Sequence, residues 1–509
     1  MAGSLTPRRA AGLAGLVALA GGAVALNHNI VGVYYDDGLY AGLAWALGHG
    51  RGFVYPNLPG TPAAIHYPPA YPLMLAPLFG ALSVPTAVFA GKVVNLLCAA
   101  LATALLVWHA ARQDLIGKGV TRWLAVVLGA AAAVAIPWLS ILTTLMSEPL
   151  FALLTSIAVI LGDRAPPELG SRGAALAAGA TAAAASLVRT IGIALCVGVV
   201  VQVWRNTRSR GPRAAGIAVA WAASPCLVAA VGWAWWVRAH RGGLDPLLAS
   251  DYGSYLSLLS TVSLGSVLRG LADLPRPLAV LTLNWAPNYF LYYLCGVPAI
   301  VVGVCGLWQL ARTSVIGGTL VAYLAVLALW PVPPDRFLWA VLPWLAIAWA
   351  TGAAAHWRAT WWRTPVLALA AVLGFGFVRY QVRGFAGRWW ERAGAQVAAE
   401  FPAVLAHVDS LPSDAVIATD HEPLVWLYTG RRAVPFYIYA IHGRTVFEPP
   451  VDVHRAYLER QGVTYVLAGG GDLRGSEELE RLRDSYPGWL RLVGRWTDGR
   501  TLYAVQRAP

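Results

Sequence analysis

The chain has few charged residues. Asp, Glu, Lys and Arg make up only 12% of its 509 residues, whereas 58% are hydrophobic, and the mean hydropathy is +0.57. A soluble globular protein carries roughly twice that charged fraction. Uncharged runs of roughly 20 residues, long enough to cross a bilayer, recur along most of the chain. The composition therefore excludes an ordinary soluble protein and predicts a polytopic α-helical membrane protein.

Lysine is almost absent. Lys92 and Lys118 are the only lysines, so arginine supplies most of the net charge of +13. The arginines lie mostly in short loops between apolar runs, which is the positive-inside pattern of membrane proteins. The positive charge therefore indicates topology, and it does not predict a nucleic-acid partner.

Cysteine is also scarce, and the common cofactor motifs are absent. The chain has no CxxC spacing, no Walker A sequence, no HExxH, no GxSxG and no dinucleotide fingerprint. The sequence therefore supports neither ATP nor a redox cofactor. The five cysteines fall in predicted spans and are interpreted as small apolar residues, with no disulfide framework or metal site: Cys98, Cys196, Cys226, Cys295 and Cys305.

About eleven membrane spans are predicted. The first, near 10–31, is interpreted as an uncleaved helix whose start Arg8 and Arg9 hold in the cytoplasm. Residues 173–204 fit one long span or a hairpin broken near Arg189. The hairpin is favoured because a single crossing would put the next arginine cluster outside. The other spans are expected near residues 84–109, 122–141, 148–162, 214–237, 289–310, 314–330, 337–354 and 364–378.

The composition changes after Tyr380. Residues 385–509 contain most of the acidic residues, strand-like runs such as AVIATD, VTYVLAGG and LYAVQ, and helix-like segments such as VDVHRAYLERQG and SEELERLRDSY. An odd span number places this small α/β domain outside the cytoplasm. The predicted organisation is a transmembrane domain over 1–384, with outer loops 32–83 and 238–280, followed by a soluble extracytoplasmic domain over 385–509. The protein is predicted to be a multi-pass protein of the plasma membrane.

Two adjacent carboxylates, Asp36 and Asp37, follow the first span. A carboxylate at a membrane surface can take the proton of an attacking hydroxyl, while its neighbour positions the acceptor or a divalent cation. The alternative is a solvated turn past a helix end. His66 and Tyr67 open a Pro-rich stretch in the same outer loop. His66 could orient a carboxylate or bind substrate or metal, or it could be an ordinary loop residue.

Ionisable residues also lie in or beside apolar segments. Charged groups there are costly, and they usually face a polar cavity, a partner or an anion. The arginine fork suits phosphate. The alternatives are a carboxylate favoured by a helix N-terminus and basic side chains that snorkel to the interface. These candidate residues are Lys92, Glu148, Arg189 and Arg336.

Two further groups give weaker signals. Asp251, Tyr252 and Tyr255 in the second outer loop could close over a substrate, but an ordinary loop is the stronger interpretation. In the C-terminal domain, Asp420-His421-Glu422 follows a predicted strand and is interpreted as a helix cap.

The order of these motifs resembles the C-type glycosyltransferases of the membrane. It is most similar to the branch that contains the protein O-mannosyltransferases and the lipid A aminoarabinose transferases. The resemblance covers roughly residues 10–380 and rests on the order of short motifs. These motifs are Asp36-Asp37, HYPPAYP from His66, SEPL from Ser147, LVRT from Leu187 and RFLWAVLP from Arg336.

The resemblance implies a polyprenyl-phosphate-linked monosaccharide as the donor. Asp36 would be the base that deprotonates the acceptor hydroxyl, and Glu148 would match the acidic group of the family. Protein mannosyltransferases have Asp-Glu at the first acidic position, so the role of Asp37 stays open. The leaving lipid phosphate would be stabilised by Lys92, Arg189 and Arg336.

The resemblance does not identify the sugar, and it leaves a protein, a lipid or a glycan as the acceptor. Some relatives bind a divalent metal near the first outer loop, but no metal ligand is assigned here. The alternative function is a lipid-sugar flippase or secondary transporter, which would place ionisable residues near mid-membrane in two related halves. A scaffold that only presents the external domain would leave Asp36, Glu148 and Lys92 unexplained.

Overall fold

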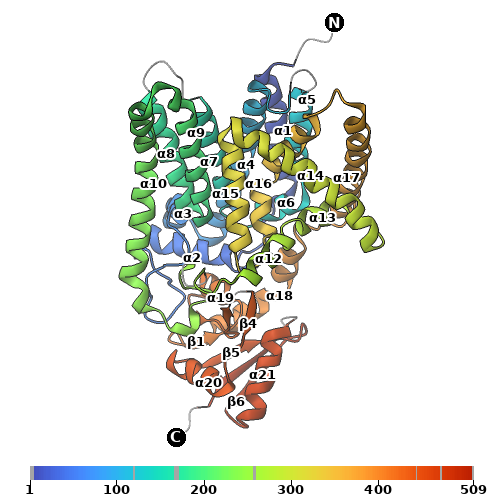
Figure 1. Cartoon of the computed structure of the whole chain (residues 1–509). Helices are drawn as coiled ribbons and strands as arrows, with labels where there is room; N and C mark the ends of the chain where they lie inside the picture. The colour runs from blue at the N-terminus through green and yellow to red at the C-terminus, as the bar shows by residue number, and fades with distance from the viewer. Residues whose placement is uncertain are drawn as a thin grey trace. The chain divides into compact units, whose positions relative to one another are not determined.

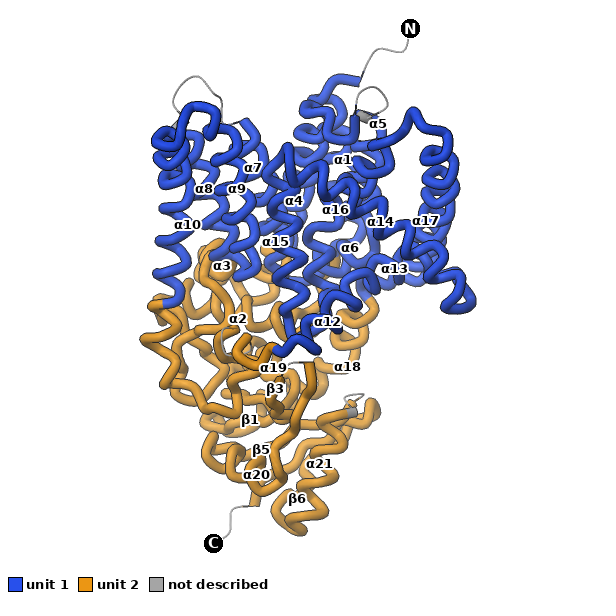
Figure 2. Tube along the Cα trace, viewed as in Figure 1, with its two compact units in different colours: residues 1–26, 92–234, 263–391 blue, residues 27–91, 235–262, 392–509 orange. Residues whose placement is uncertain are grey.

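The computed structural model describes residues 5–117, 121–164, 171–255, 259–442, 444–470 and 473–506. Lys118 lies outside these residues. The described chain is mostly helical, with a small sheet in its C-terminal part (Figure 1). It folds as two compact units (Figure 2). Unit 1 consists of Met1–Leu26, Lys92–Ala234 and Ser263–Glu391, and unit 2 consists of Asn27–Gly91, Trp235–Val262 and Arg392–Pro509.

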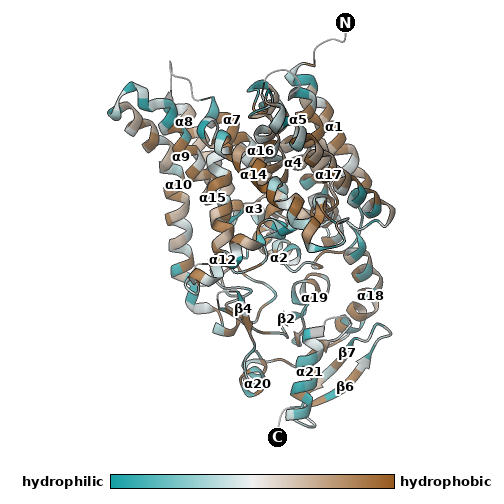
Figure 3. Ribbon diagram, turned by 45° about the vertical axis from the view of Figure 1, so that its right-hand side comes forward, coloured by the Kyte–Doolittle hydropathy of each residue, from teal (hydrophilic) through white to brown (hydrophobic). Residues whose placement is uncertain are grey.

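Apolar helices build unit 1, and hydrophobic residues cover most of their length (Figure 3). Helices lie at all eleven predicted spans. Seven helices of the described chain are long and apolar enough to cross a membrane, or eight if one bent pair forms a single span. The chain is a multi-pass membrane protein, and its count of eleven spans stays a prediction. The helices at the predicted span positions, whether or not each is long enough to cross a membrane, are α1 (Pro7–Ala25), α4 (Val84–Arg112), α5 (Thr121–Ala133), α6 (Ile136–Leu142), α7 (Glu148–Asp163), α8 (Ser171–Val188), α9 (Ile193–Thr207), α10 (Pro212–His240), α14 (Tyr289–Thr313), α15 (Val315–Leu329), α16 (Asp335–Ala354) and α17 (Thr360–Ala386).

The helices are interrupted within one expected span and between the two arms of the expected hairpin. The segment predicted near 122–141 is a pair of helices, α5 and α6, bent by 56°. Pro137 follows the bend and has no N–H to donate to the preceding turn. The predicted break near Arg189 is confirmed, because α8 ends at Val188 and a 3-10 turn, Thr190–Gly192, leads into α9.

Small residues let the helices of unit 1 approach closely. A Cβ on Gly198 of α9 would lie 2.8 Å from the carbonyl oxygen of Val315 in α15. A Cβ on Gly306 of α14 would overlap the carbonyl oxygen of Ala348 in α16. Close backbone packing at small residues is how helices associate without a hydrophobic driving force in a bilayer. Two shorter helices, α12 (Leu264–Asp273) and α13 (Arg276–Thr282), complete this unit.

Unit 2 contains a five-stranded sheet in the order β2-β1-β5-β7-β6. Strand β1 runs parallel to β2 and β5, whereas β7 runs antiparallel to β5 and β6. The predicted small C-terminal α/β region is therefore present. Its strands are β1 (Val416–Ala418), β2 (Arg432–Val434), β5 (Tyr465–Ala468), β6 (Leu490–Arg495) and β7 (Thr501–Val505), with a separate hairpin of β3 (Ala440–His442) and β4 (Thr445–Phe447). Its helices are α2 (Asp36–Gly48), α3 (Ala70–Ala81), α18 (Arg392–Asp409), α19 (Glu422–Thr429), α20 (Val451–Arg460) and α21 (Leu473–Ser485).

The first outer loop shares a hydrophobic core with the C-terminal domain. Phe401 and Leu424 are fully buried members of this core, and Ile30 and Val33 pack against it. Gly32 approaches so closely that a Cβ there would lie 2.5 Å from Cβ of Leu424. The sequence division assigned both outer loops to the transmembrane domain. The compact units instead join the first loop and residues 238–262 of the second loop to the C-terminal domain, and keep residues 263–280 in unit 1.

Candidate active site

The predicted site residues form two groups, one in each unit. The group in unit 1 contains a carboxylate and three cations: Lys92, Glu148, Arg189 and Arg336. The group in unit 2 contains the acidic pair and the first residues of the Pro-rich stretch: Asp36, Asp37, His66 and Tyr67.

Two arginines meet one carboxylate in unit 1. Nη1 of Arg189 lies 2.7 Å from Oε1 of Glu148, and Nε of Arg336 lies 3.1 Å from the same oxygen. Glu148 is fully buried and Arg189 nearly so, whereas Arg336 is about one-third exposed, at 32%. Because a buried carboxylate costs a large desolvation energy, these ion pairs are what permits Glu148 in an apolar helix bundle.

Breaks between helices bring these three side chains together. Glu148 is the first residue of α7, and Arg336 is the second residue of α16. Arg189 has extended backbone between α8 and the 3-10 turn, where it also donates a 3.0 Å hydrogen bond to Oγ of Ser147. Its guanidinium lies 5.0 Å from the ring centroid of Phe337. Arg189 therefore has three partners that fix its fork.

Lys92 is fully buried on α4. Asn95 follows it by one helical turn and donates a 3.0 Å hydrogen bond to the carbonyl of Met146, next to Ser147. The amide of Asn95 thus fastens α4 to the segment that carries Glu148. A buried lysine in an apolar helix is expensive, as the sequence interpretation assumed.

In unit 2, Tyr67 donates a 2.6 Å hydrogen bond to Oδ1 of Asp36. The Asp36 carboxylate is half-buried, whereas Asp37 is fully buried. The ring of Tyr67 packs on Tyr40, with ring centroids 4.8 Å apart. The hydroxyl therefore orients the carboxylate of a residue that is partly open to solvent.

The backbone immediately before Asp36 is strained. Tyr35 has φ +66° and ψ −66°, and the amide of Asp36 donates a 2.7 Å hydrogen bond to the carbonyl of Tyr34. This is a γ-turn of the rare positive-φ kind. Such strain persists where surrounding structure enforces it, and it concentrates at functional sites. The turn immediately precedes α2, which begins at Asp36.

Asp37 has a different environment from its neighbour. Its Oδ1 accepts a 3.0 Å hydrogen bond from the amide of Tyr34. Burial raises the pKa of Asp37, while the amides of Gly32 and Tyr34 oppose that rise. The structure therefore separates the pair into a reachable carboxylate and a buried one that holds the turn.

His66 ties two loop segments together. Its Nδ1–H donates a 2.5 Å hydrogen bond to the carbonyl of Gly253 in the second outer segment. Burial lowers the pKa of His66 to about 4, so the ring is neutral at physiological pH. The ring packs on Tyr67 and Tyr255, with centroids 4.5 and 4.1 Å apart. His66 therefore links two loop segments and packs against the ring of Tyr67.

The sequence interpretation missed the contacts of two acidic residues in unit 2, the fully buried Glu422 and the half-buried Asp251. Tyr252 donates a 2.9 Å hydrogen bond to Oε1 of Glu422, and Tyr439 donates a 2.7 Å hydrogen bond to Oδ1 of Asp251. Burial raises the pKa of Glu422 to about 8 and that of Asp251 to about 6. These residues are far apart in the chain, so no local pattern indicates their contact.

The predicted helix cap at Asp420-His421-Glu422 is wrong. Helix α19 begins at Glu422, and its N-cap His421 makes no side-chain cap hydrogen bond. Asp420 instead accepts a 2.7 Å hydrogen bond from the amide of Tyr437. The polar triplet fails as a cap because its side chains bind other parts of unit 2.

The described residues contain no group of three or more His, Cys, Asp or Glu side chains that could hold a metal ion. A divalent cation therefore has no evident ligand set there, and no chemical step is assigned to one. Cys98, Cys196 and Cys226 are buried, while Cys295 and Cys305 are half-buried.

Comparisons of sequence find no relative, because no protein-family model and no curated protein matches the chain. Comparisons of structure do. ArnT from Cupriavidus metallidurans in the apo state is 16% identical, with 96% of each chain covered and a TM-score of 0.55. The same protein bound to undecaprenyl phosphate is 17% identical over 96% of each chain, with a TM-score of 0.50.

An oligosaccharyltransferase from Archaeoglobus fulgidus, in complex with Zn and sulfate, is also similar in structure. It is 10% identical, with 97% of this chain and 73% of that chain covered and a TM-score of 0.50. These likenesses extend over almost the whole chain and include both compact units. The chain therefore has the fold of the C-type membrane glycosyltransferases, as the order of its motifs predicts.

Proposed function

We propose that this protein is a membrane glycosyltransferase. It moves a monosaccharide from a polyprenyl-phosphate-linked donor to an acceptor hydroxyl on the extracytoplasmic side, with inversion at the anomeric carbon. The observation that carries the proposal is the meeting of Arg189 and Arg336 on buried Glu148, at the ends of apolar helices. Guanidinium forks held in this way suit the phosphate of a lipid. The binding of undecaprenyl phosphate by ArnT, which shares the fold, supports the same class of donor.

Asp36 is the base in this reaction. Its carboxylate takes the proton of the acceptor hydroxyl while the hydroxyl oxygen attacks the anomeric carbon. Tyr67 holds one carboxylate oxygen at 2.6 Å, so the carboxylate is oriented before the acceptor arrives. Asp37, whose carboxylate is buried, keeps the γ-turn in place and contacts no substrate.

The bond between the anomeric carbon and the phosphate oxygen breaks as the new bond forms. The polyprenyl phosphate leaves with the electron pair, and Arg189, Arg336 and Lys92 stabilise its charge. Glu148 positions the two arginines. Because a phosphate is already a weak base, the leaving group needs no strong general acid.

The positions of the ionisable residues favour an enzyme over the flippase or transporter alternative. Glu148 and Arg336 occupy the first turns of α7 and α16, at helix ends. A transporter would carry such groups near the middle of broken helices in two related halves. The proposal leaves open the sugar and the class of acceptor, which includes proteins, lipids and glycans.

Transfer of radiolabelled sugar in membranes tests the proposal. Membranes that contain the protein are incubated with polyprenyl-phosphate donors carrying different sugars, and label is followed into lipid, protein and glycan fractions. We expect label transfer from at least one donor, with equal release of polyprenyl phosphate, and none from membranes without the protein. A protein that binds undecaprenyl phosphate but transfers no sugar from any donor would contradict the proposal.

A further inference from the structure

Three helices of unit 1 carry the same pattern of side chains. Each has aliphatic residues at positions i and i+4, tryptophan at i+11 and arginine at i+15, a spacing that puts all four on one helix face. The three sets are Leu97, Leu101, Trp108 and Arg112 on α4; Ile193, Val197, Trp204 and Arg208 at α9; and Val297, Val301, Trp308 and Arg312 on α14.

The aliphatic residues of all three sets lie on the surface of unit 1, with 41% to 54% of each side chain exposed. In a membrane protein, such residues face lipid. The tryptophan comes eleven positions after the first aliphatic residue, a rise of about 16.5 Å along the helix. That length is roughly half of a hydrocarbon core of about 30 Å. Each face is therefore as long as one leaflet is thick.

Each arginine lies against the tryptophan one turn earlier. The guanidinium carbons of Arg112, Arg208 and Arg312 lie 5.1, 5.4 and 4.2 Å from the ring centroids of their tryptophans. Arg164, at the end of α7, also lies over Trp108, at 4.3 Å. All four arginines are exposed, and within the described part of the chain none forms an ion pair.

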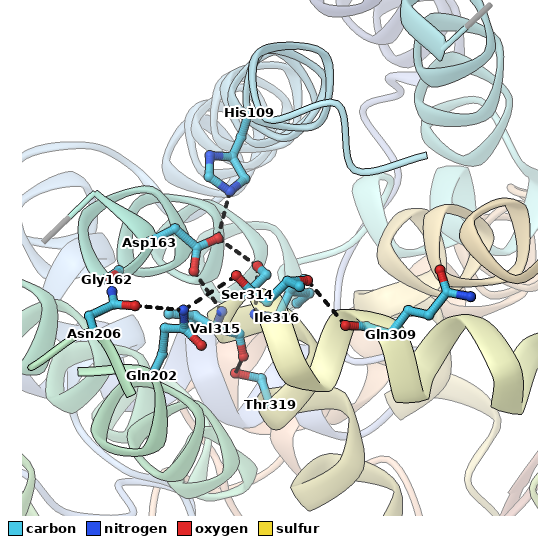
Figure 4. A network of polar contacts seen from close by, with 11 residues as sticks. His109, Gly162, Asp163, Gln202, Asn206, Gln309, Ser314, Val315, Ile316 and Thr319 are labelled. Carbon is cyan, nitrogen blue, oxygen red and sulfur yellow. Dashed lines mark hydrogen bonds and ion pairs between the residues drawn. The ribbon is translucent and has the colours of Figure 1, made fainter. Parts of the chain in front are cut away.

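A polar network joins the ends of the helices that carry the three faces (Figure 4). His109, next to Trp108, contacts Asp163 at 2.8 Å, and Asp163 accepts a 2.5 Å hydrogen bond from Ser314. Gln202, near Trp204, donates a 3.3 Å hydrogen bond to the carbonyl of Thr313, which ends α14. The C-terminal ends of α4, α7, α9 and α14 are thereby fastened together.

We propose that these three faces are binding sites for anionic glycerophospholipids of a single leaflet. The acyl chains lie along the aliphatic residues, the tryptophan sits at the level of the headgroup, and the arginine binds the phosphate. The face of α4 binds most tightly, because Arg112 and Arg164 flank the same ring. An acidic protein segment would explain the arginines but not the leaflet-long aliphatic face. The inference depends on the membrane fold and not on the proposed sugar transfer.

Native mass spectrometry of the full-length protein tests this inference. The protein is released from nanodiscs that contain equal amounts of phosphatidylglycerol and phosphatidylcholine, and the retained lipids are counted. We expect retention of up to three lipids, with phosphatidylglycerol preferred. In the triple variant R112Q/R208Q/R312Q, we expect affinity for phosphatidylglycerol to fall about fivefold per site, the effect of one lost arginine at a membrane surface.

A matched variant separates specific sites from general positive charge. R9Q/R213Q/R358Q removes three exposed arginines that stack on no tryptophan in the described residues, and it should retain wild-type binding. The variant R112K/R208K/R312K keeps the charge but loses the planar fork, so an intermediate loss is expected. Equal losses in the two glutamine variants, or no preference for phosphatidylglycerol in the wild type, would overturn the inference.

Discussion

The hydroxyl of Tyr67 lies 2.6 Å from Oδ1 of Asp36, a contact between residues that are 31 positions apart. It joins the first residue of α2 to the Pro-rich stretch that leads into α3. Because a charged acceptor shortens and strengthens such a bond, the tyrosine is well placed to hold this carboxylate in one orientation. The proposed chemistry depends on that orientation.

Replacing Tyr67 by phenylalanine removes this hydrogen bond and keeps the ring. A hydrogen bond to a charged group contributes about 1.5–3 kcal/mol, so sugar transfer should fall roughly 10- to 100-fold. The acidic limb of the pH–rate profile should also move to higher pH, because the hydroxyl favours the charged carboxylate. Initial rates between pH 5 and 8 measure both effects. Y34F, a change in an exposed neighbour, serves as the control. A rate loss in Y67F without any change in the pH profile would indicate a purely structural tyrosine.

The ion pairs of Glu148 predict a large effect on stability. The variant E148Q leaves two arginines without their buried carboxylate, and removing one partner of a buried pair costs about 3–5 kcal/mol. We expect a clear fall in the thermal unfolding midpoint of the detergent-solubilised protein. E391Q is the matched control, since Glu391 pairs at the surface with Arg388, which is 64% exposed, and exposed pairs contribute at most about 1 kcal/mol. Similar thermal unfolding midpoints for E148Q and E391Q would show that Glu148 does not hold the two arginines in place.

Gly38 lies beside the strained turn in a very crowded position. A Cβ there would lie 2.9 Å from Cα of Gly32 and 2.8 Å from Cβ of Pro423. We expect G38A to cost about 1–3 kcal/mol in stability and to reduce transfer by displacing Asp36. The control G42A is one turn further along α2, where the nearest atom would be 3.5 Å away on Trp426. Expression level, unfolding midpoint and transfer rate are compared. Full activity in G38A would mean that the position of Asp36 tolerates movement of the turn.

Most of the helices were predictable from the sequence, because each helix is determined by a continuous stretch of residues. Apolar runs of bilayer length produce the helices, and the break at Arg189 follows from where a charged residue interrupts a run. The γ-turn at Tyr35 was not predictable, since tyrosine is no turn former. Neither was the pairing of Tyr252 with Glu422, which packing across 170 positions creates. The repeated spacing of the tryptophan–arginine faces was not recognised in the sequence, because their aliphatic residues occur within long runs of other apolar residues.

The raised pKa of Glu422 predicts that unit 2 loses stability as pH rises. Its pKa is about 8 in the fold, through burial, against 4.5 for an ordinary glutamate. At a pH between these two pKa values, Glu422 is therefore protonated in the folded state and ionised in the unfolded state. The contribution of Glu422 to the free energy of unfolding is fully present below pH 4.5. It falls by at most about 1.4 kcal/mol per pH unit between pH 4.5 and 8, and it does not change further above pH 8.

The variant E422Q tests the origin of that pH dependence. Glutamine carries no titrating proton, so the unfolding midpoint should vary less between pH 5 and 8 than in the wild type. E459Q, at an exposed residue of α20 that pairs with Arg455, should keep the wild-type dependence. The same steep fall in E422Q as in the wild type would assign the dependence to other groups, such as Asp251.

The most direct test of the account is sugar transfer by D36N, measured together with binding of undecaprenyl phosphate. Asparagine keeps the shape of the side chain but cannot take the proton from the hydroxyl that receives the sugar. We predict that the folded variant binds the lipid phosphate as the wild type does, while transfer from the labelled donor falls about 10²- to 10⁴-fold, the usual contribution of a general base. Transfer at the wild-type rate by D36N would contradict the assignment of Asp36 as the base.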